Sequence, residues 1–202
     1  MIGIINYNMG NLASVYNACH LLDGNAQIVN DPNKLKDFDK VILPGVGAFG
    51  DAMEHLIETG MKDAVLDYAK SGKPMLGICL GMQLLFESSC EFGEHKGLGL
   101  IDGHIVKFDK SKMHDDTKVP HMGWNVIKTK DEHTLFEGLE DPYLYFVHSF
   151  HVETDPKNVI GKTEYGYEFA SAVHKDNIYG FQPHPEKSHD NGLTILKNFI
   201  NL

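Results

Sequence analysis

Cys79 lies in the sequence context of a catalytic nucleophile. The motif Gly77-Ile78-Cys79-Leu80-Gly81 follows an apolar run and leads into a stretch whose apolar residues recur at helical spacing. This strand–turn–helix pattern is typical of a nucleophile elbow, here with cysteine in the place of serine. The two glycines suit so sharp a turn, because a residue without a Cβ tolerates close contacts and unusual dihedrals. A lone cysteine is often an inert core residue, but this motif favours a nucleophile whose thiolate is stabilised by the start of the following helix.

A base and a carboxylate occur together much later in the chain, in the motif His184-Pro185-Glu186. A residue that precedes proline is pushed into extended geometry, so the backbone should be extended through His184. Residues two apart in an extended chain point to the same side, which predicts that His184 and Glu186 share a face. A thiol, an imidazole and an orienting carboxylate form an activated-nucleophile triad, so we predict Cys79, His184 and Glu186 as catalytic residues. The chain has twelve histidines, and a hydrogen-bonded structural histidine is the competing interpretation.

The segment 45–50, Gly-Val-Gly-Ala-Phe-Gly, spells a G-x-G-x-x-G motif between a predicted strand and a predicted helix. Taken alone, the motif suggests a dinucleotide site. However, it follows the third predicted strand rather than the first, and no strand-ending acid appears about twenty residues later. A loop that aims backbone N–H groups at a developing oxyanion fits better, together with the residue after the nucleophile. We therefore predict Leu80, Val46 and Gly47 as the oxyanion hole.

Composition restricts the possible functions. The chain has 202 residues, 42% of them hydrophobic, enough for one sizeable core and a single domain over residues 1–202. A formal net charge of −10 argues against nucleic-acid binding, which needs clustered Lys and Arg. No segment approaches the roughly eighteen apolar residues of a membrane span, and no signal peptide is recognisable. Three sparse cysteines fit a reducing compartment better than a disulfide framework, so we expect a cytoplasmic protein.

The order of predicted elements indicates an α/β fold. Strands over 2–6, 26–29, 40–43 and 74–78 alternate with helices over 11–22, over 51–70 with a break near Gly60, and after Cys79. Asn11 is the predicted N-cap of the first helix. Later come short strand-like runs at 103–108, 125–129, 143–147, 159–163, 169–174 and 178–182, and a last helix over 188–200. This predicts a three-layer architecture with a mostly parallel central sheet, flanking helices and an added antiparallel portion.

We predict no metal site and no cofactor. The pair His148-x-x-His151 lies in a strand-like run, where a spacing of three residues should put the two rings on opposite faces. The sequence also lacks a cysteine pair or an H-E-x-x-H motif with ligand spacing. These two histidines are therefore expected to be structural or to contact substrate.

The motifs together resemble the class I glutamine amidotransferases. The resemblance is carried by PGVG at 44–47, GICLGMQ at 77–83 and HPEKS at 184–188. Two further segments, NYNMGNL at 6–12 and PHMGWN at 120–125, are similar to the glutaminase subunits of imidazole glycerol phosphate synthases, which act in histidine biosynthesis. The likeness runs from residue 1 to the C-terminus.

The resemblance implies a reaction and a set of substrate contacts. Cys79 would attack the side-chain amide of glutamine to give a glutamyl thioester and ammonia, and water would then release glutamate. His184 would move the protons while Glu186 orients its ring. The residues implied to bind glutamine are Gly45, Gly47, Gln83, Ser149 and Phe150. Gln83 lies one helical turn after Cys79, which favours a pocket-facing side chain over a solvated one.

The resemblance also implies a partner protein. Ammonia released into water is soon protonated and then cannot act as a nucleophile, so it should pass directly to a second active site. The implied partner is a (β/α)₈-barrel cyclase subunit, in a heterodimer with an ammonia channel. Asn11, Trp124 and Lys187 match the family's interface motifs. A lone tryptophan is often a core residue, but tryptophan is also favoured at interface hot spots.

Some residues depart from the family pattern. Pro183 replaces the aromatic residue that usually precedes the catalytic histidine, and it removes a backbone donor from the expected strand end. Asn6 and Asn8 stand where relatives more often carry aspartate and glycine. Two alternatives therefore stay open: a related glutaminase subunit that supplies ammonia for amidation of a surface-polysaccharide sugar, and a non-catalytic binding module.

Overall fold

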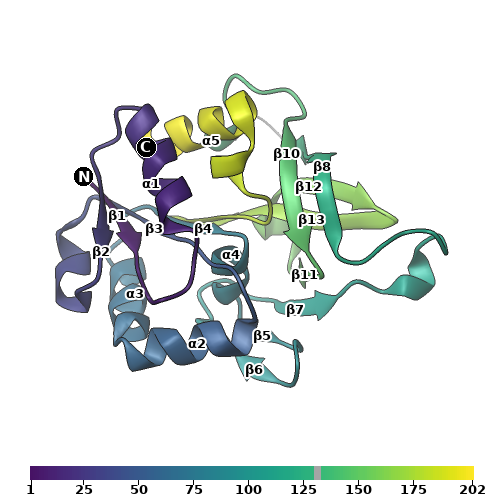
Figure 1. Ribbon diagram of the computed structural model, residues 1–202, viewed down its shortest axis with the longest axis horizontal. Coiled ribbons are helices and arrows are strands. Elements are labelled where there is room, and N and C mark those ends of the chain that lie inside the picture. The colour runs from purple at the N-terminus through teal and green to yellow at the C-terminus, as the bar shows by residue number, and fades with distance from the viewer. Residues whose placement is uncertain (130–132) are drawn as a thin grey trace.

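The computed structural model describes residues 1–129 and 133–202. Within them, twelve strands form one mixed sheet (Figure 1). Five neighbouring strands are mutually parallel: β2 (Ala26–Val29), β1 (Ile2–Ile5), β3 (Lys40–Leu43), β4 (Met75–Ile78) and β14 (Ile178–Phe181). The sheet continues, mostly antiparallel, through β13 (Tyr167–Lys175), β11 (Phe150–Glu153), β7 (His104–Lys107), β5 (Ser88–Ser89) and β6 (His95–Lys96). β12 (Val159–Tyr165) pairs with both β13 and β9 (Lys128–Thr129).

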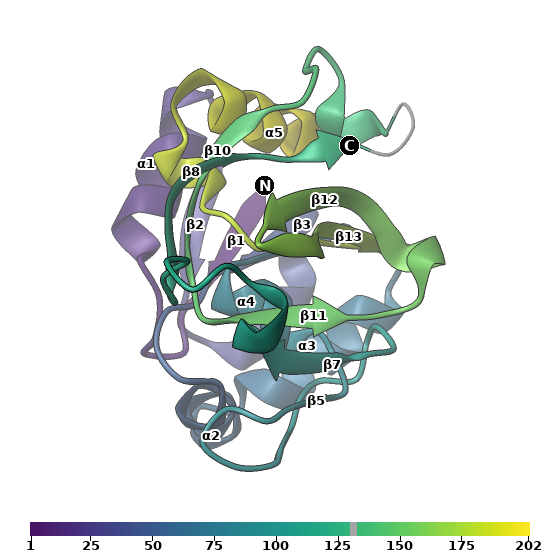
Figure 2. The ribbon, with the colours of Figure 1, turned by 90° about the vertical axis from the view of Figure 1, so that its right-hand side faces the viewer.

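Helices cover both faces of the parallel strands. α1 (Leu12–Leu21) and α5 (His189–Asn201) lie on one face, and α2 (Phe49–Glu58) and α3 (Met61–Lys70) lie on the other (Figures 1 and 2). Successive side chains of β3 point to opposite faces of the sheet, so this one strand contributes to the core on both sides. Ile42 packs in the core with α1 and α5, whereas Val41 and Leu43 pack in the core with α2 and α3. The predicted three-layer architecture is confirmed.

A separate two-stranded antiparallel sheet, β8 (His121–Val126) and β10 (Tyr143–His148), lies next to β12 (Figure 1). Its inner side packs largely through rings, beside the buried Leu144. His121 stacks between Phe146 and Tyr165, with ring centroids 4.7 and 3.9 Å away. Phe108 lies 5.2 Å from the ring of His148, the residue opposite His121 in the pairing.

The short helical elements complete the chain. α4 (Leu80–Leu84) follows β4 directly, and the described residues include 3₁₀ turns at Pro32–Asp37, Lys110–Lys112, Thr134–Phe136, Pro156–Asn158 and Pro185–Lys187. None of the helices in the described parts of the chain has the length and apolar character needed to cross a membrane.

Most predicted elements are present, with informative differences. Asn11 caps α1 as predicted, accepting a hydrogen bond from the amide of Ser14. The break predicted near Gly60 is confirmed, since Gly60 adopts a left-handed conformation at φ 72° between α2 and α3. The strand predicted over 125–129 is divided between β8 and β9. The two-residue strands β5 and β6 were not predicted, since so few residues carry no periodicity.

The expectation that His148 and His151 lie on opposite faces of one strand is wrong. The chain leaves β10 after His148 and enters β11, which belongs to the other sheet. Both rings therefore contact the same residue, Phe108, at 5.2 and 4.9 Å between centroids. Alternation along a strand holds only while the strand continues, and Ser149 interrupts it.

The close packing of α4 on the neighbouring strand β3 requires a glycine at position 81. A Cβ at this position would lie 1.9 Å from the carbonyl oxygen of Leu43, a backbone atom that cannot move away cheaply. At Gly72, in contrast, a Cβ would meet nothing within 4 Å, although its φ of 76° disfavours a side chain.

We predict that Gly81→Ala destabilises the protein by about 3 kcal/mol, because the added methyl group forces α4 off β3. Gly72→Ala serves as the control and should cost about 1 kcal/mol, from its left-handed backbone alone. Urea unfolding followed by circular dichroism measures both. Equal losses in the two variants would contradict the packing role of Gly81.

Acid should destabilise the fold through the buried histidines of the small sheet. Burial lowers the pKa of His121 to about 4 and that of His148 to about 3. In the unfolded chain both groups titrate near pH 6.5. Below that pH the unfolded chain binds protons that the folded chain does not, so the free energy of unfolding falls as the pH drops from about 6.5 toward 4. Urea midpoints measured across this window should decrease, and His121→Gln should flatten the decrease. A midpoint independent of pH would contradict the burial of neutral histidines.

Candidate active site

Cys79 occupies the turn between β4 and α4, so the predicted strand–turn–helix context is confirmed. Its amide donates to the carbonyl of Phe181, and its carbonyl accepts from the amide of Gln83. The unusual dihedrals fall on the cysteine itself, at φ 54° and ψ −113°. Gly77 is required for a different reason: a Cβ there would lie 2.7 Å from the Cα of Met82. Gly77 and Gly81 thus allow α4 to pack closely against the sheet, while the strained backbone of Cys79 orients its side chain.

His184 follows the neighbouring strand β14 and is held in extended geometry, at φ −103° and ψ 91°. Its amide donates to the carbonyl of Tyr145 on β10, 2.9 Å away. Pro183 lies beyond the last ladder bond of its strand, which runs from the amide of Gln182 to Ser171. The expected loss of a ladder donor at Pro183 therefore does not displace the histidine.

Nδ1 of His184 and Oε1 of Glu186 lie 2.7 Å apart, and the two side chains are only 2% and 1% exposed. The expectation that they meet on one face of an extended chain is wrong in its geometry. Pro185 starts a 3₁₀ turn that includes Glu186, and this turn folds the carboxylate back onto the ring. Proline at the first helical position favours such a turn because its φ is already suitable.

The charge state of His184 reflects its two neighbours. Burial acts to lower the pKa of His184, but interactions with Cys79 and Glu186 outweigh it and raise that pKa to about 10. Within the described residues, no atom makes a hydrogen bond of good geometry to Nε2 of His184. The neighbouring thiol of Cys79 nevertheless contributes to the raised pKa of the ring. Glu186 thus orients the ring at Nδ1, and the raised pKa favours the protonated ring beside Cys79, so the imidazole holds the thiol proton as the base partner of a thiolate nucleophile does.

Cys79 and His184 line one pocket of about 200 Å³. This volume is below the roughly 300 Å³ of sites for drug-sized ligands and suits an amino acid. The lining comes from the glycine loop, the elbow with α4, the β5–β6 hairpin, the end of β10 with the start of β11, and the segment after β14. The lining residues are Val46, Gly47, Cys79, Leu80, Gln83, Glu91, Val147, His148, Ser149, Phe150 and His184.

The pocket collects most of the residues predicted from sequence. Val46, Gly47 and Leu80 stand beside the cysteine, and Gln83, Ser149 and Phe150 form further parts of the wall. Gly45 is not part of the lining. It lies buried behind the loop, where a Cβ would be 2.7 Å from the hydroxyl oxygen of Tyr7.

Two residues at the site, Glu91 and Gln182, were missed by sequence reasoning, and His148 was expected only to be either structural or substrate-contacting. Glu91 lines the pocket, and its Oε2 accepts a 2.7 Å hydrogen bond from the amide of Phe49 at the start of α2. His148 lines the pocket from the end of β10. Gln182, fully buried, places its Nε2 3.9 Å from Sγ of Cys79. No local motif marks Glu91, but Gln182 could have been suspected from its place two residues before the predicted base.

The three residues predicted to contact a partner lie on neighbouring elements. Trp124 on β8 is 37% exposed and stacks on His189, with ring centroids 5.0 Å apart. Lys187 is exposed in the 3₁₀ turn that carries Glu186, and this turn packs against both α1 and β10. Asn11, partly buried, uses its Oδ1 to cap α1. The turn of Lys187 thus lies between α1 and β10, the strand that pairs with β8.

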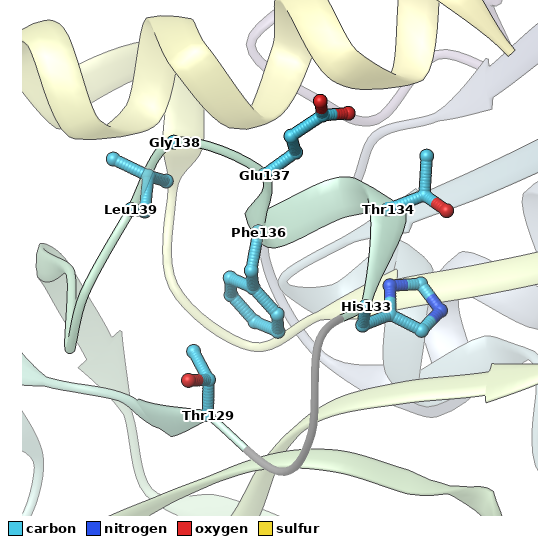
Figure 3. A pocket seen from close by; sticks show the side chains of 7 residues that line it. All are labelled: Thr129, His133, Thr134, Phe136, Glu137, Gly138 and Leu139. Carbon is cyan, nitrogen blue, oxygen red and sulfur yellow. The ribbon is translucent and has the colours of Figure 1, made fainter.

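Other hollows lack the nucleophile. One of about 650 Å³ lies beside α5 (Figure 3) and is lined by Thr129, His133, Thr134, Phe136, Glu137, Gly138 and Leu139. Another, of about 1060 Å³, is lined mainly by residues 115–122. The smaller pocket at Cys79 holds the nucleophile and the base together, so chemistry rather than size identifies the site.

Comparisons with known proteins agree with this geometry. The family model for class-I glutamine amidotransferases matches residues 8–202. A protein of Sulfurimonas denitrificans, "Imidazole glycerol phosphate synthase subunit HisH", is 66% identical over 201 residues, which cover 98% of this chain and 97% of that one. The protein of the same name from Wolinella succinogenes is 60% identical, with both chains fully covered.

Solved structures show the same fold at low identity. One described as a glutamine amidotransferase superposes with a TM-score of 0.77 at 16% identity, covering 100% of this chain and 99% of the other. The PurLQS structure from Thermotoga maritima gives a TM-score of 0.74 at 21% identity, covering 99% and 97%. The family model spans nearly all of the sequence, and the full-length relatives are well above 30% identical. The chain therefore belongs to the class-I glutamine amidotransferase family.

Proposed function

We propose that this protein is the glutaminase subunit of an imidazole glycerol phosphate synthase, folded as one domain over residues 1–202. It hydrolyses glutamine and passes the ammonia to a partner cyclase in histidine biosynthesis. The names and full-length coverage of its relatives support this assignment. The observation that carries it is the shared pocket of Cys79 and His184, with Glu186 bonded to the far side of the imidazole. That intact set of residues argues against a non-catalytic module.

The proposed reaction uses these groups in sequence. Nε2 of His184 accepts the thiol proton, and Sγ of Cys79 attacks the amide carbon of the glutamine side chain. The resulting oxyanion is stabilised by amide N–H groups of Leu80 and of the Val46–Gly47 loop. His184 returns the proton to the leaving nitrogen, which departs as ammonia and leaves a thioester. Water, deprotonated by the same ring, then attacks the thioester and releases glutamate and the thiol.

The pocket wall offers complementary groups for the rest of the substrate. Nε2 of Gln83 donates to the carbonyl of Phe150 and to Oε1 of Gln182, at 3.2 and 2.9 Å. Its own Oε1 is then left as an acceptor for a substrate N–H group. Glu91 provides a carboxylate to pair with the α-ammonium group, and Ser149 adds a hydroxyl. Gly47 remains the loop backbone proposed to contact glutamine, whereas Gly45, also expected from the resemblance, lies buried behind that loop.

Direct transfer of ammonia requires a docked partner, and we propose a (β/α)₈-barrel cyclase in a heterodimer. The surface around Asn11, Trp124 and Lys187 is the proposed interface. Two large exposed apolar residues adjoin Trp124: Met122 is 62% exposed and Tyr143 is 50% exposed. Aromatic residues and methionine are enriched in interface cores. The free thiols of Cys19, Cys79 and Cys90 support a reducing, cytoplasmic location.

Cys79→Ala should reduce glutamate formation by about 10³-fold or more, because no other side chain replaces the thiolate. The assay uses the complex with the cyclase from the same organism, with and without the cyclase's ribonucleotide substrate. The variant should still bind the cyclase, which excludes misfolding as the cause. Residual hydrolysis close to wild type would refute the nucleophile assignment. Ammonia transfer to a sugar-modifying enzyme instead of the cyclase would favour the polysaccharide alternative.

Trp124→Ala should weaken cyclase binding by about 2 kcal/mol, or roughly 30-fold in Kd, as expected for a central aromatic residue. Ile57→Ala on α2 is the control, since Ile57 is 57% exposed on a different element. Isothermal titration calorimetry measures both affinities. If both variants bind like wild type, Trp124 does not belong to the interface.

A further inference from the structure

A row of hydrogen bonds connects the small sheet to the wall of the candidate active site. Nδ2 of Asn125 lies 3.3 Å from Nε2 of His121, and Nδ1 of His121 lies 3.0 Å from Nε2 of His148. Nδ1 of His148 then lies 2.7 Å from the carbonyl oxygen of Phe150. The row begins on β8 and ends at a residue that lines the pocket.

The direction of every bond in this row is determined by its ends. The carbonyl of Phe150 can only accept, so Nδ1 of His148 carries the proton and Nε2 of the neutral ring accepts. His121 must then donate from Nδ1, which leaves its Nε2 as an acceptor for Asn125. The amide of Asn125 is itself anchored to the backbone: Nδ2 donates to the carbonyl of Glu164, and Oδ1 accepts from Val126.

Both rings are held neutral by their surroundings. His121 and His148 are 2% and 7% exposed, and burial lowers both of their pKa values well below neutrality. A proton added to either ring would put a donor against a donor. The row therefore has a single arrangement of protons at neutral pH.

The bond from His148 reaches the substrate wall through one backbone atom. The same carbonyl of Phe150 accepts from Nε2 of Gln83, whose other Nε2 proton goes to Oε1 of Gln182. With both protons engaged, Gln83 can present only its Oε1 to a bound molecule. Gln182 in turn points its own Nε2 toward Sγ of Cys79. The orientation of two amide side chains thus depends on where the carbonyl of Phe150 lies.

We propose that His148, supported by His121, is a positioning residue that fixes the Phe150 carbonyl and thereby the amide of Gln83 for glutamine binding. This inference rests on the proposed glutaminase activity. His148 lines the pocket but is not a base for Cys79, since both of its ring nitrogens are engaged elsewhere. Its contribution is to substrate binding, not to the chemical step.

His151 provides a matched control within the same ring cluster. It is 4% exposed and packs on Phe108 like His148. Its Nε2 bonds to the hydroxyl of Tyr167 at 2.8 Å, and its Nδ1 faces the carbonyl of Val152, so neither nitrogen reaches the pocket wall. A purely structural role would make the two histidines equivalent.

The test is steady-state glutaminase kinetics of the complex with its cyclase, for His148→Leu, His148→Asn and His151→Leu. We expect His148→Leu to raise the KM for glutamine about tenfold with kcat within about threefold, the effect of one lost hydrogen bond. His148→Asn should recover most of this KM, because its Nδ2 replaces the Nδ1 donor. His151→Leu should leave KM unchanged. Alkylation of Cys79 by iodoacetamide, followed on the isolated peptide, should proceed equally in all variants.

The proposal fails if His148→Leu lowers kcat at unchanged KM, if His151→Leu raises KM equally, or if asparagine gives no recovery. If His148→Leu does not fold, the KM for glutamine is measured for His121→Phe instead. Phenylalanine preserves the stack between Phe146 and Tyr165 while removing the bond to His148, and it must raise KM at least about twofold. A wild-type complex without glutaminase activity would overturn the proposed function itself. A normal wild type with an unaffected His148→Leu would overturn only this inference.

Discussion

The parallel pairing of β4 with β14 is the constraint on which the candidate active site depends. In this register Ile78 lies opposite Phe181, so the two strands end together at one edge of the sheet. The amide of Cys79 continues the pairing by donating to Phe181 at 2.8 Å. Cys79 and His184 therefore leave the sheet at the same edge, although the chain separates them widely. The carboxyl ends of parallel strands are where α/β proteins assemble their sites.

Strain at the nucleophile is tolerated because the surrounding packing leaves it no alternative. A non-glycine residue with positive φ costs of order 1–3 kcal/mol. At Cys79 this backbone is held from both sides, by Phe181 on the next strand and by Gln83 in the following helix. Gly77 and Gly81 allow that helix to approach the sheet so closely. The backbone geometry of this turn thereby places Cys79 at the pocket.

The two halves of the chain contribute different walls of the pocket. The parallel half supplies the elbow and the glycine loop, whereas β10 and the segment that follows it supply the opposite wall. β10 also anchors His184 through the carbonyl of Tyr145. The added antiparallel strands are therefore part of the site, and the histidine-rich packing beneath them is linked to it by hydrogen bonds. The side of the molecule proposed for the partner includes β8, the same strand from which that hydrogen-bond row starts.

Features that depend on near neighbours in the chain could be predicted from the residues alone. The elbow at Cys79, the break at Gly60, the cap at Asn11 and the strands of the parallel half all follow from local motifs and periodicity. Tertiary structure decided how His184 meets Glu186, through a turn rather than a strand face. It also decided the places of Glu91 and Gln182, whose partners Phe49 and Gln83 lie 42 and 99 residues away. Local rules act over a few residues, whereas such contacts exist only after the sheet has fixed its register.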